Sequence, residues 1–113
     1  MNLDQLATEI ELASPDSNGR GLAAALRSWK ADSADVNTLA VLGERYIGHT
    51  WFETDLTHDA IYKLWSSFRA AAISNIGGMT MNERLYSFSL SERFDAAGPI
   101  EREVLYGKLL ARP

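Results

Sequence analysis

Two imidazoles and three carboxylates lie within the stretch HTWFETDLTHD, and these residue types can bind metal ions. They are His49, Glu53, Asp55, His58 and Asp59. Histidine and carboxylate ligands suit zinc or manganese. The spacing differs, however, from that of a helical zinc motif, in which two histidines four residues apart flank a glutamate. We therefore expect no metal here, and we expect most of the stretch to form a linker between two helices, with His58 and Asp59 in the first turn of the second helix.

The same stretch places aromatic side chains beside charges, a pattern typical of a protein-binding surface. Trp51 and Phe52 precede three acidic residues that fall within seven positions. Carboxylates steer a basic partner toward a surface, and aromatic rings anchor it. A solvated loop with its rings buried in the core is the alternative, and the sequence leaves both open. We predict that residues 49–59, with Glu44 in the preceding helix, bind a protein partner.

A second polar group, in the stretch TMNERL, suggests a catalytic pair but is better explained by helix capping. Thr80 and Glu83 have the spacing of a capping box, in which each side chain bonds the other residue's backbone amide. Glu83 and Arg84 are adjacent, so on a helix their side chains point about 100° apart and form no close acid–base pair. We expect Arg84 to bond a helix terminus or a carboxylate, and Asn82 to have a structural role.

The alternation in the stretch YSFSLS, residues 86–91, would also suit a half-buried strand. A lone strand leaves its backbone groups without partners, and no other segment alternates over more than a few residues. We therefore predict a helix that begins at Thr80 and continues to about Ala97.

Signatures of common catalytic and cofactor sites are missing from the sequence. It has no G-x-S-x-G nucleophile elbow, no phosphate loop and no dinucleotide-binding glycine motif. It has no cysteine, which excludes thiol nucleophiles, thiolate metal sites and disulfides. We expect a protein that is not an enzyme, has no catalytic residues and needs no cofactor.

The overall charge argues against nucleic acid as the partner. The chain has 15 acidic and 11 basic residues, a formal net charge of −4. An acidic surface repels phosphate backbones unless it contains a compact basic patch, and none is visible. The sequence also lacks a signal-peptide pattern and any apolar run of the roughly 18 to 20 residues that cross a bilayer. We expect a cytoplasmic protein with a basic protein partner, without nucleic acid or membrane binding, and of undetermined oligomeric state.

Apolar residues recur at helical spacing along the chain, which predicts an all-α fold. A length of 113 residues with 46% hydrophobic content suits one compact domain, residues 1–113. We expect about five to six helices, with Trp29 and Trp65 in the core. Gly77 or Gly78 should end the fourth helix in a left-handed conformation. The expected helices are 2–13, 21–31, 36–47 with Ser33 or Asp35 as its cap, 57–76 with Thr57 as its cap, 80–97 and 99–109.

The segment GGMTMNERLYSFSLSERFDAA resembles the C-terminal signature of a family of small, mostly uncharacterised bacterial proteins. Its members carry Gly-Met-Thr-x-Asn-Glu-Arg-Leu followed by Tyr or Phe, then a short hydrophobic run and Phe-Asp-x-Ala. The match covers residues 78–97, under a fifth of the chain, and YSFSLS departs from the family, where Gly and Leu are more frequent. The resemblance implies a short helical protein without a known catalytic residue.

By type, a small, acidic, cysteine-free helical protein is similar to the immunity proteins of bacterial toxin systems. That resemblance implies stoichiometric binding of a basic toxin domain, such as a nuclease, and coverage of its active or docking surface. The alternative is a small regulatory or adaptor protein that acts through protein–protein contacts. A toxin gene immediately upstream would favour the immunity protein.

Overall fold

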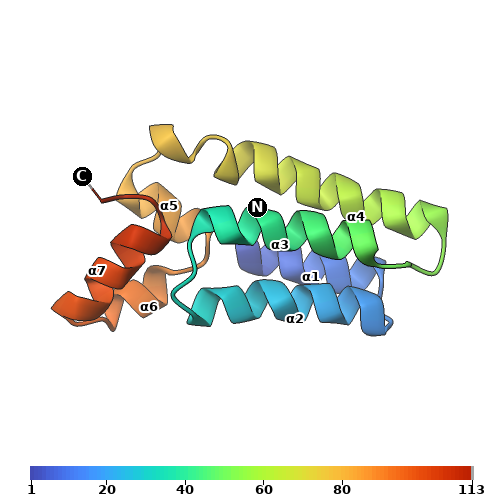
Figure 1. Cartoon of the computed structure of the whole chain (residues 1–113), viewed down its shortest axis with the longest axis horizontal. Coiled ribbons are helices and arrows are strands. Elements are labelled where there is room, and N and C mark those ends of the chain that lie inside the picture. Colours follow the sequence, from blue (N-terminus) through green and yellow to red (C-terminus); the bar gives the residue numbers. More distant parts are fainter. Residues whose placement is uncertain (113) are drawn as a thin grey trace.

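The structure is a computed structural model that describes residues 1–112, and this part of the chain contains seven α-helices and no strand (Figure 1). Six of the seven have seven or more residues, which confirms the predicted all-α fold. None of the described helices is long and apolar enough to cross a membrane. The helices are α1 (Leu3–Ala13), α2 (Ser17–Ala31), α3 (Val36–His49), α4 (Asp55–Phe68), α5 (Met81–Ser87), α6 (Ser91–Asp95) and α7 (Pro99–Lys108).

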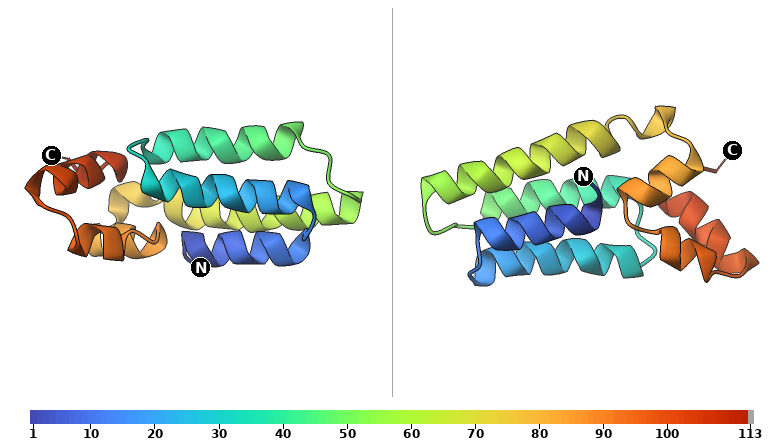
Figure 2. Two further views of the ribbon diagram at one scale, coloured as in Figure 1. Left: turned by 90° about the horizontal axis from the view of Figure 1, so that it is seen from below. Right: turned by 180° about the vertical axis from the view of Figure 1, so that it is seen from behind.

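The four long helices α1 to α4 lie side by side along the long axis of the molecule, and the three shorter helices α5 to α7 pack at one end of them (Figure 1 and Figure 2). The molecule measures 46 × 24 × 20 Å. The turn between α1 and α2 and the linker between α3 and α4 both lie at the opposite end (Figure 1). The two ends of the long-helix array therefore differ, because one is covered by helices and the other is formed by connecting segments.

Side-chain caps determine where α1 and α3 begin. Asn2 and Gln5 form a capping box at α1, since each side chain bonds the other residue's backbone amide. At α3 the cap is Asp35, one of the two predicted residues, whose carboxylate accepts the Thr38 amide at 2.9 Å. Both helices then bury the apolar stripe that predicted them.

The start of α2 lies one turn earlier than predicted, at Ser17. Asp16 caps this helix and accepts the backbone amides of Asn18 and Gly19, so the Asn-Gly pair forms its first turn instead of a separate loop. A Cβ atom at Gly19 would lie 1.8 Å from the Ser14 carbonyl oxygen. The close approach of Gly19 to the end of α1 at this turn therefore requires glycine.

The boundaries of α4 also differ from the prediction. Thr54 is the N-cap in place of Thr57, and its hydroxyl accepts the Thr57 amide at 3.0 Å. Beyond Phe68 the helix widens into a π-helical turn, Arg69–Ile73, and a 3-10 turn follows at Ile76–Gly78. No glycine in the described chain has a positive φ, so the predicted left-handed terminator at Gly77 or Gly78 is wrong.

Aromatic rings join the long helices to the C-terminal helices in the core. The centroid of the Phe88 ring lies 5.8 Å from that of Trp29 and 5.7 Å from that of Phe68. Trp29 and Trp65 are buried, as their positions on the apolar stripes predicted. Tilted and edge-on ring pairs each contribute about 0.5–1.5 kcal/mol beyond area burial. Gly43 of α3 faces Trp65, and a Cβ there would lie 2.2 Å from the indole ring, so α3 and α4 pack closely.

The prediction of one helix over residues 80–97 is wrong, because the chain breaks between α5 and α6. Ser89 has a left-handed backbone conformation with φ of 57°. The Leu90 amide donates to the Leu85 carbonyl at 2.8 Å, which is the long hydrogen bond of a Schellman motif. The Ser89 hydroxyl accepts the backbone N–H of Asp4 at 3.0 Å. The break thus ties the C-terminal helices to the first turn of α1.

The capping box at the start of α5 is confirmed. The Thr80 amide donates to the Glu83 carboxylate at 2.9 Å, and the Glu83 amide donates to the Thr80 hydroxyl at 3.2 Å. These bonds, chiefly the one from the Thr80 backbone, lower the pKa of Glu83. Arg84 donates to the carbonyls of Leu109 and Leu110 at 2.9 and 2.7 Å, so it bonds a neighbouring helix terminus as expected.

Lys108 of α7 places a buried ammonium group at the C-terminal end of α2. Its Nζ donates to the carbonyls of Trp29 and Ala34 and to the Asp32 carboxylate, the last two at 2.8 and 2.9 Å. It also lies 3.7 Å from the centroid of the Trp29 ring. The residue is only 1% exposed, and burial lowers the pKa of its ammonium group, while the Asp32 carboxylate opposes that shift.

Arg93 of α6 bonds the same end of α2. Its guanidinium donates to the carbonyls of Lys30 and Asp32 at 2.5 and 2.8 Å, and it also pairs with Glu101 of α7 at 2.6 Å. The last carbonyls of a helix have no partners within the helix and carry partial negative charge. Two cations from the C-terminal helices therefore satisfy this terminus and hold the two parts of the molecule together.

Replacement of the α5 cap tests the capping box. Thr80→Ala should lower the free energy of unfolding by about 0.5–2 kcal/mol, because the Glu83 amide loses its acceptor. Urea unfolding measures the change. Thr8→Ala, at an exposed position in α1, is the control and should change stability little. Equal effects of the two substitutions would contradict a specific role for the cap.

Replacement of Lys108 tests the buried ammonium group. Lys108→Met keeps an apolar stem against Trp29 but removes the charged donor to the Trp29 and Ala34 carbonyls, so the free energy of unfolding should fall by about 1–3 kcal/mol. Thermal and urea unfolding measure the change in the free energy of unfolding. Lys63→Met, at an exposed position of α4, is the matched control. Unchanged or higher stability would mean that the desolvation of the ammonium group cancels its hydrogen bonds.

Candidate functional site

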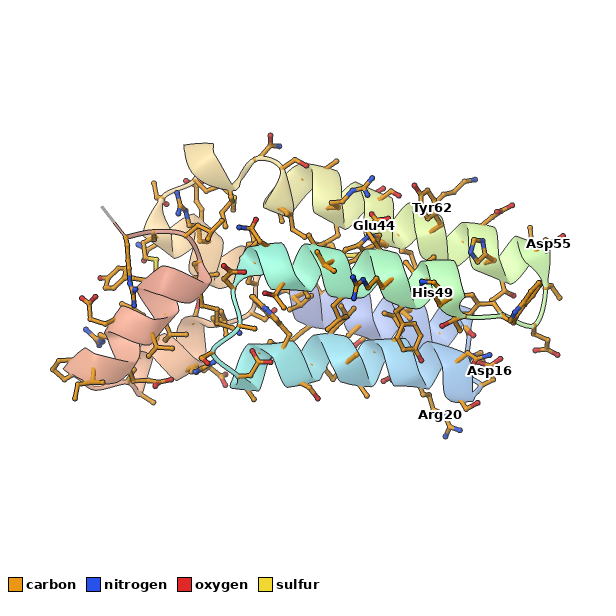
Figure 3. The ribbon with its side chains drawn as sticks, in the orientation of Figure 1. Asp16, Arg20, Glu44, His49, Asp55 and Tyr62 are labelled. Atoms are coloured by element: carbon orange, nitrogen blue, oxygen red, sulfur yellow. The ribbon has the colours of Figure 1, made fainter. Side chains whose placement is uncertain are left out.

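The predicted partner-binding residues gather mainly at the end of the molecule opposite α5 to α7. We call residues 47–59 the bundle-end surface; they comprise the end of α3, the linker and the start of α4. Figure 3 shows His49 and Asp55 at this end, with Arg20 of the neighbouring α2 and its N-cap Asp16 beside it. Two connections of the chain, distant in sequence, therefore contribute to one surface.

Hydrogen bonds to the start of α2 hold the linker in place. The side-chain amide of Asn18 donates to the Trp51 carbonyl at 2.5 Å. The hydroxyl of Tyr46, in α3, donates to the Asn18 carbonyl at 3.1 Å. Tyr46 lies so close to Gly21 that a Cβ there would be 2.2 Å from the hydroxyl oxygen. The path of the linker is thus fixed by α2, and its side chains are presented from a defined backbone.

Asp16 adds a further carboxylate at this end. It accepts hydrogen bonds from the backbone amides of Gly19 and Asn18 and from the Ser14 hydroxyl. These bonds, chiefly the one from Gly19, hold the pKa of Asp16 below its usual value. Arg20 follows one turn later and offsets part of the negative charge.

The linker sends its two aromatic side chains in opposite directions. Trp51 is 91% exposed, whereas Phe52 is 8% exposed and belongs to the core. Leu56, in the first turn of α4, is 80% exposed. Of the two alternatives for these aromatics, burial holds for Phe52 and exposure holds for Trp51. Phe52 anchors the linker, while Trp51 and Leu56 offer apolar area to solvent.

Carboxylates surround this apolar area. Glu53, Asp55 and Asp59 are all exposed, and none pairs with a lysine or arginine of residues 1–112. A hollow of about 430 Å³ opens in the bundle-end surface, and of these three carboxylates only that of Asp55 lines it, together with Trp51. The arrangement combines an accessible aromatic ring with free negative charge, which suits the recognition of a cationic group.

The two histidines also border this hollow. His49 is exposed and His58 is half-buried, with its ring centroid 5.8 Å from that of Phe52. The His58 Nδ1 lies 3.9 Å from the Asp59 carboxylate. Among residues 1–112 no three or more His, Cys, Asp or Glu side chains are grouped to hold a metal ion. The prediction that folding needs no metal stays a prediction.

Glu44 lies apart from the other predicted contact residues. Its carboxylate accepts the indole N–H of Trp65 at 3.1 Å and pairs with Arg69. It therefore faces α4 along the side of the array, as Figure 3 also shows, and its side chain is 41% exposed. The contact between α3 and α4 accounts for this residue, and its part in partner binding stays a prediction.

The polar residues at the start of α5 are occupied within the fold. Glu83 serves the capping box, and Arg84 bonds the end of α7. Asn82 is exposed, and its structural role stays a prediction. Because Glu83 and Arg84 are both bonded at helix ends, they do not form a free acid–base pair.

Two contributors to the site were missed in the sequence. The apolar stripe of α4 contains Ile61, Trp65 and Phe68, and Leu56 does not lie on it. Its position off the stripe could have predicted that Leu56 is exposed. Asn18 lies between the predicted helices 2–13 and 21–31, outside both. Its bond to the linker joins residues 33 positions apart, and no local pattern indicates such a contact.

Comparisons of this chain with protein-family models, with curated proteins and with solved structures find no match. The resemblance of residues 78–97 to a bacterial protein family, and the resemblance of type to immunity proteins, therefore stay predictions. Any functional proposal depends on the side chains of the chain itself.

Fluorescence quenching tests the exposure of the linker. Trp29 and Trp65 are buried and Trp51 is exposed, so acrylamide should quench mainly Trp51. Trp51→Phe should remove most of the quenchable emission and leave the melting temperature unchanged. A variant that is quenched as strongly as the parent would show that the exposed indole is not Trp51.

Proposed function

We propose that this protein is an immunity protein, which binds a cognate bacterial toxin and blocks the toxin's active or docking surface with the bundle-end surface. The observation that carries the proposal is the exposed Trp51 beside the free carboxylates of Glu53 and Asp55. Trp is enriched among the residues that dominate binding energy in protein interfaces. Free carboxylates favour a basic partner, such as a nuclease domain.

The charge pattern of the chain supports a partner at this end. Several cations of the molecule are engaged elsewhere, for example Arg93 and Lys108 at the end of α2 and Arg69 with Glu44. The net charge is −4, and the exposed carboxylates of the bundle-end surface have no lysine or arginine partner in the described residues. In this proposal the protein acts in the cytoplasm without catalysis and without a cofactor.

Co-expression tests the function. The reading frame immediately upstream of the gene is expressed in a heterologous bacterium with and without this protein, and viable cells are counted. An immunity protein restores growth and forms a stoichiometric complex with the upstream product. If the upstream product is harmless, or stays toxic in the presence of the protein, the proposal fails and a regulatory or adaptor role is favoured.

Charge reversal tests whether the bundle-end surface is the contact. Glu53→Lys combined with Asp55→Lys should slow association with the toxin about tenfold or more at low salt and weaken its salt dependence, because steering is lost. The variant should remain folded, since exposed carboxylates contribute little to stability. Stopped-flow association kinetics measure the rate.

The matched control reverses two exposed acids at the covered end, Glu92→Lys combined with Asp95→Lys in α6. It makes the same change in net charge and should slow association much less. If both double variants associate at the same rate, or if the first binds as fast as the parent, the contact lies elsewhere.

A further inference from the structure

The C-terminal end of α3 differs from the ends of α2 and α7. Lys108 and Arg93 bond carbonyls of the last turn of α2. Arg84 bonds the two carbonyls that directly follow α7. At α3, by contrast, no hydrogen bond within residues 1–112 ends on the carbonyls of Ile47, Gly48 or His49. The end of α3 thus has no cation of the described residues on its last carbonyls.

The open end of α3 borders the hollow of the bundle-end surface. Residues 47–50 line this hollow together with Trp51 and Asp55. Gly48 is exposed, and a Cβ atom added to it would have no other atom within 4 Å. The backbone at this position is therefore accessible. The last carbonyls of a helix carry a partial negative charge. At this hollow that charge adds to the negative charge of the Asp55 carboxylate.

The start of α4 lies at the same hollow and has the opposite polarity, but a cap and a carboxylate offset part of its positive charge. The Thr57 amide donates to the Thr54 hydroxyl, and Asp55 stands in the first turn, where a carboxylate offsets the positive end of the helix dipole. The hollow therefore presents open carbonyls, a carboxylate and the Trp51 ring, all of which attract a cation.

We propose that this hollow is the seat of an arginine side chain of the partner, with the guanidinium across the Trp51 ring and its N–H groups directed to Asp55 and the open carbonyls of α3. Among cationic side chains, arginine fits best because its planar group stacks on an aromatic face while five N–H donors reach several acceptors. The seat is built before binding, because the bond from Asn18 to the Trp51 carbonyl fixes the linker. This inference rests on the proposed function only in assigning the arginine to a toxin.

The test uses a tetra-arginine peptide, acetylated and amidated, as the probe and the intact protein as the receptor. Tetra-citrulline, which keeps the shape but lacks the charge, is the control peptide. Amide chemical shifts of Gly48 and His49 in NMR titrations report on the end of α3. Tetra-arginine should shift these signals saturably and citrulline should not. Equal shifts with both peptides, or none with tetra-arginine, would overturn the proposal.

Two matched pairs of variants separate a seat from general electrostatic attraction. Asp55 lines the hollow and Asp59, one turn later and also exposed, does not. Asp55→Asn should weaken tetra-arginine binding about threefold or more, and Asp59→Asn less than about 1.5-fold. Likewise, Trp51→Ala should weaken it about threefold, and Leu56→Ala should have little effect. Equal effects within both pairs would mean diffuse attraction and would refute the seat.

The outcomes of this test and of the co-expression test are independent. If tetra-arginine binds as described but no toxin is neutralised, the arginine seat stands and the immunity function fails. If a toxin is neutralised equally well by the parent and by a Trp51→Ala/Asp55→Asn variant, the immunity function stands and the seat fails. Circular dichroism and melting curves confirm that each variant is folded, as expected for exposed positions.

Discussion

The carbonyl groups at the C-terminal end of α2 have to be satisfied, and the way they are satisfied organises the whole molecule. A helix cannot bond its own last carbonyls, and buried ones need donors. Lys108 and Arg93 supply donors from α7 and α6, across more than sixty residues of sequence. The stem of Lys108 is buried as well, and its ammonium group lies over the Trp29 ring. Polar and apolar contacts thus hold the C-terminal helices at one end of the array.

This organisation explains why the two ends of the molecule have different surfaces. The covered end contains Arg84, Arg93 and Lys108, each bonded to backbone carbonyls of a helix end. The opposite end has only connecting segments, and its exposed acids have no lysine or arginine partner in the described chain. The end of α3 stays open there as well. Negative charge, open carbonyls and an exposed indole are therefore concentrated at the end that the C-terminal helices leave free.

Local patterns in the sequence predicted most of the helices, because burial stripes and caps depend on nearby residues. The stripes of α1 to α4 and the capping box of Thr80 and Glu83 are of this kind. The break at Ser89 was missed because a serine in the left-handed conformation gives no local signal, and it is fixed by a bond to α1, 85 residues away. The early start of α2 was missed because Asn-Gly favours a turn unless an upstream carboxylate caps it.

The candidate site was predictable in its position but not in its geometry. Clustered acids and aromatics indicated residues 49–59, yet only the folded chain shows that Trp51 is exposed while the adjacent Phe52 is buried. That difference depends on the path of the linker, which Asn18 fixes from α2. Glu44 was predicted to bind the partner together with these residues, but its carboxylate accepts a hydrogen bond from Trp65 in α4. Long-range contacts of this type leave no trace in spacing or composition.

The most direct test of the bundle-end surface as the contact is hydrogen–deuterium exchange, measured on this protein alone and in complex with the toxin that the proposed function requires. Binding through this surface predicts slower exchange of the amides of residues 47–59, with little change in α6 and α7. Slower exchange confined to α5 to α7 would contradict it, as would a neutralising complex in which residues 47–59 exchange as fast as in the free protein.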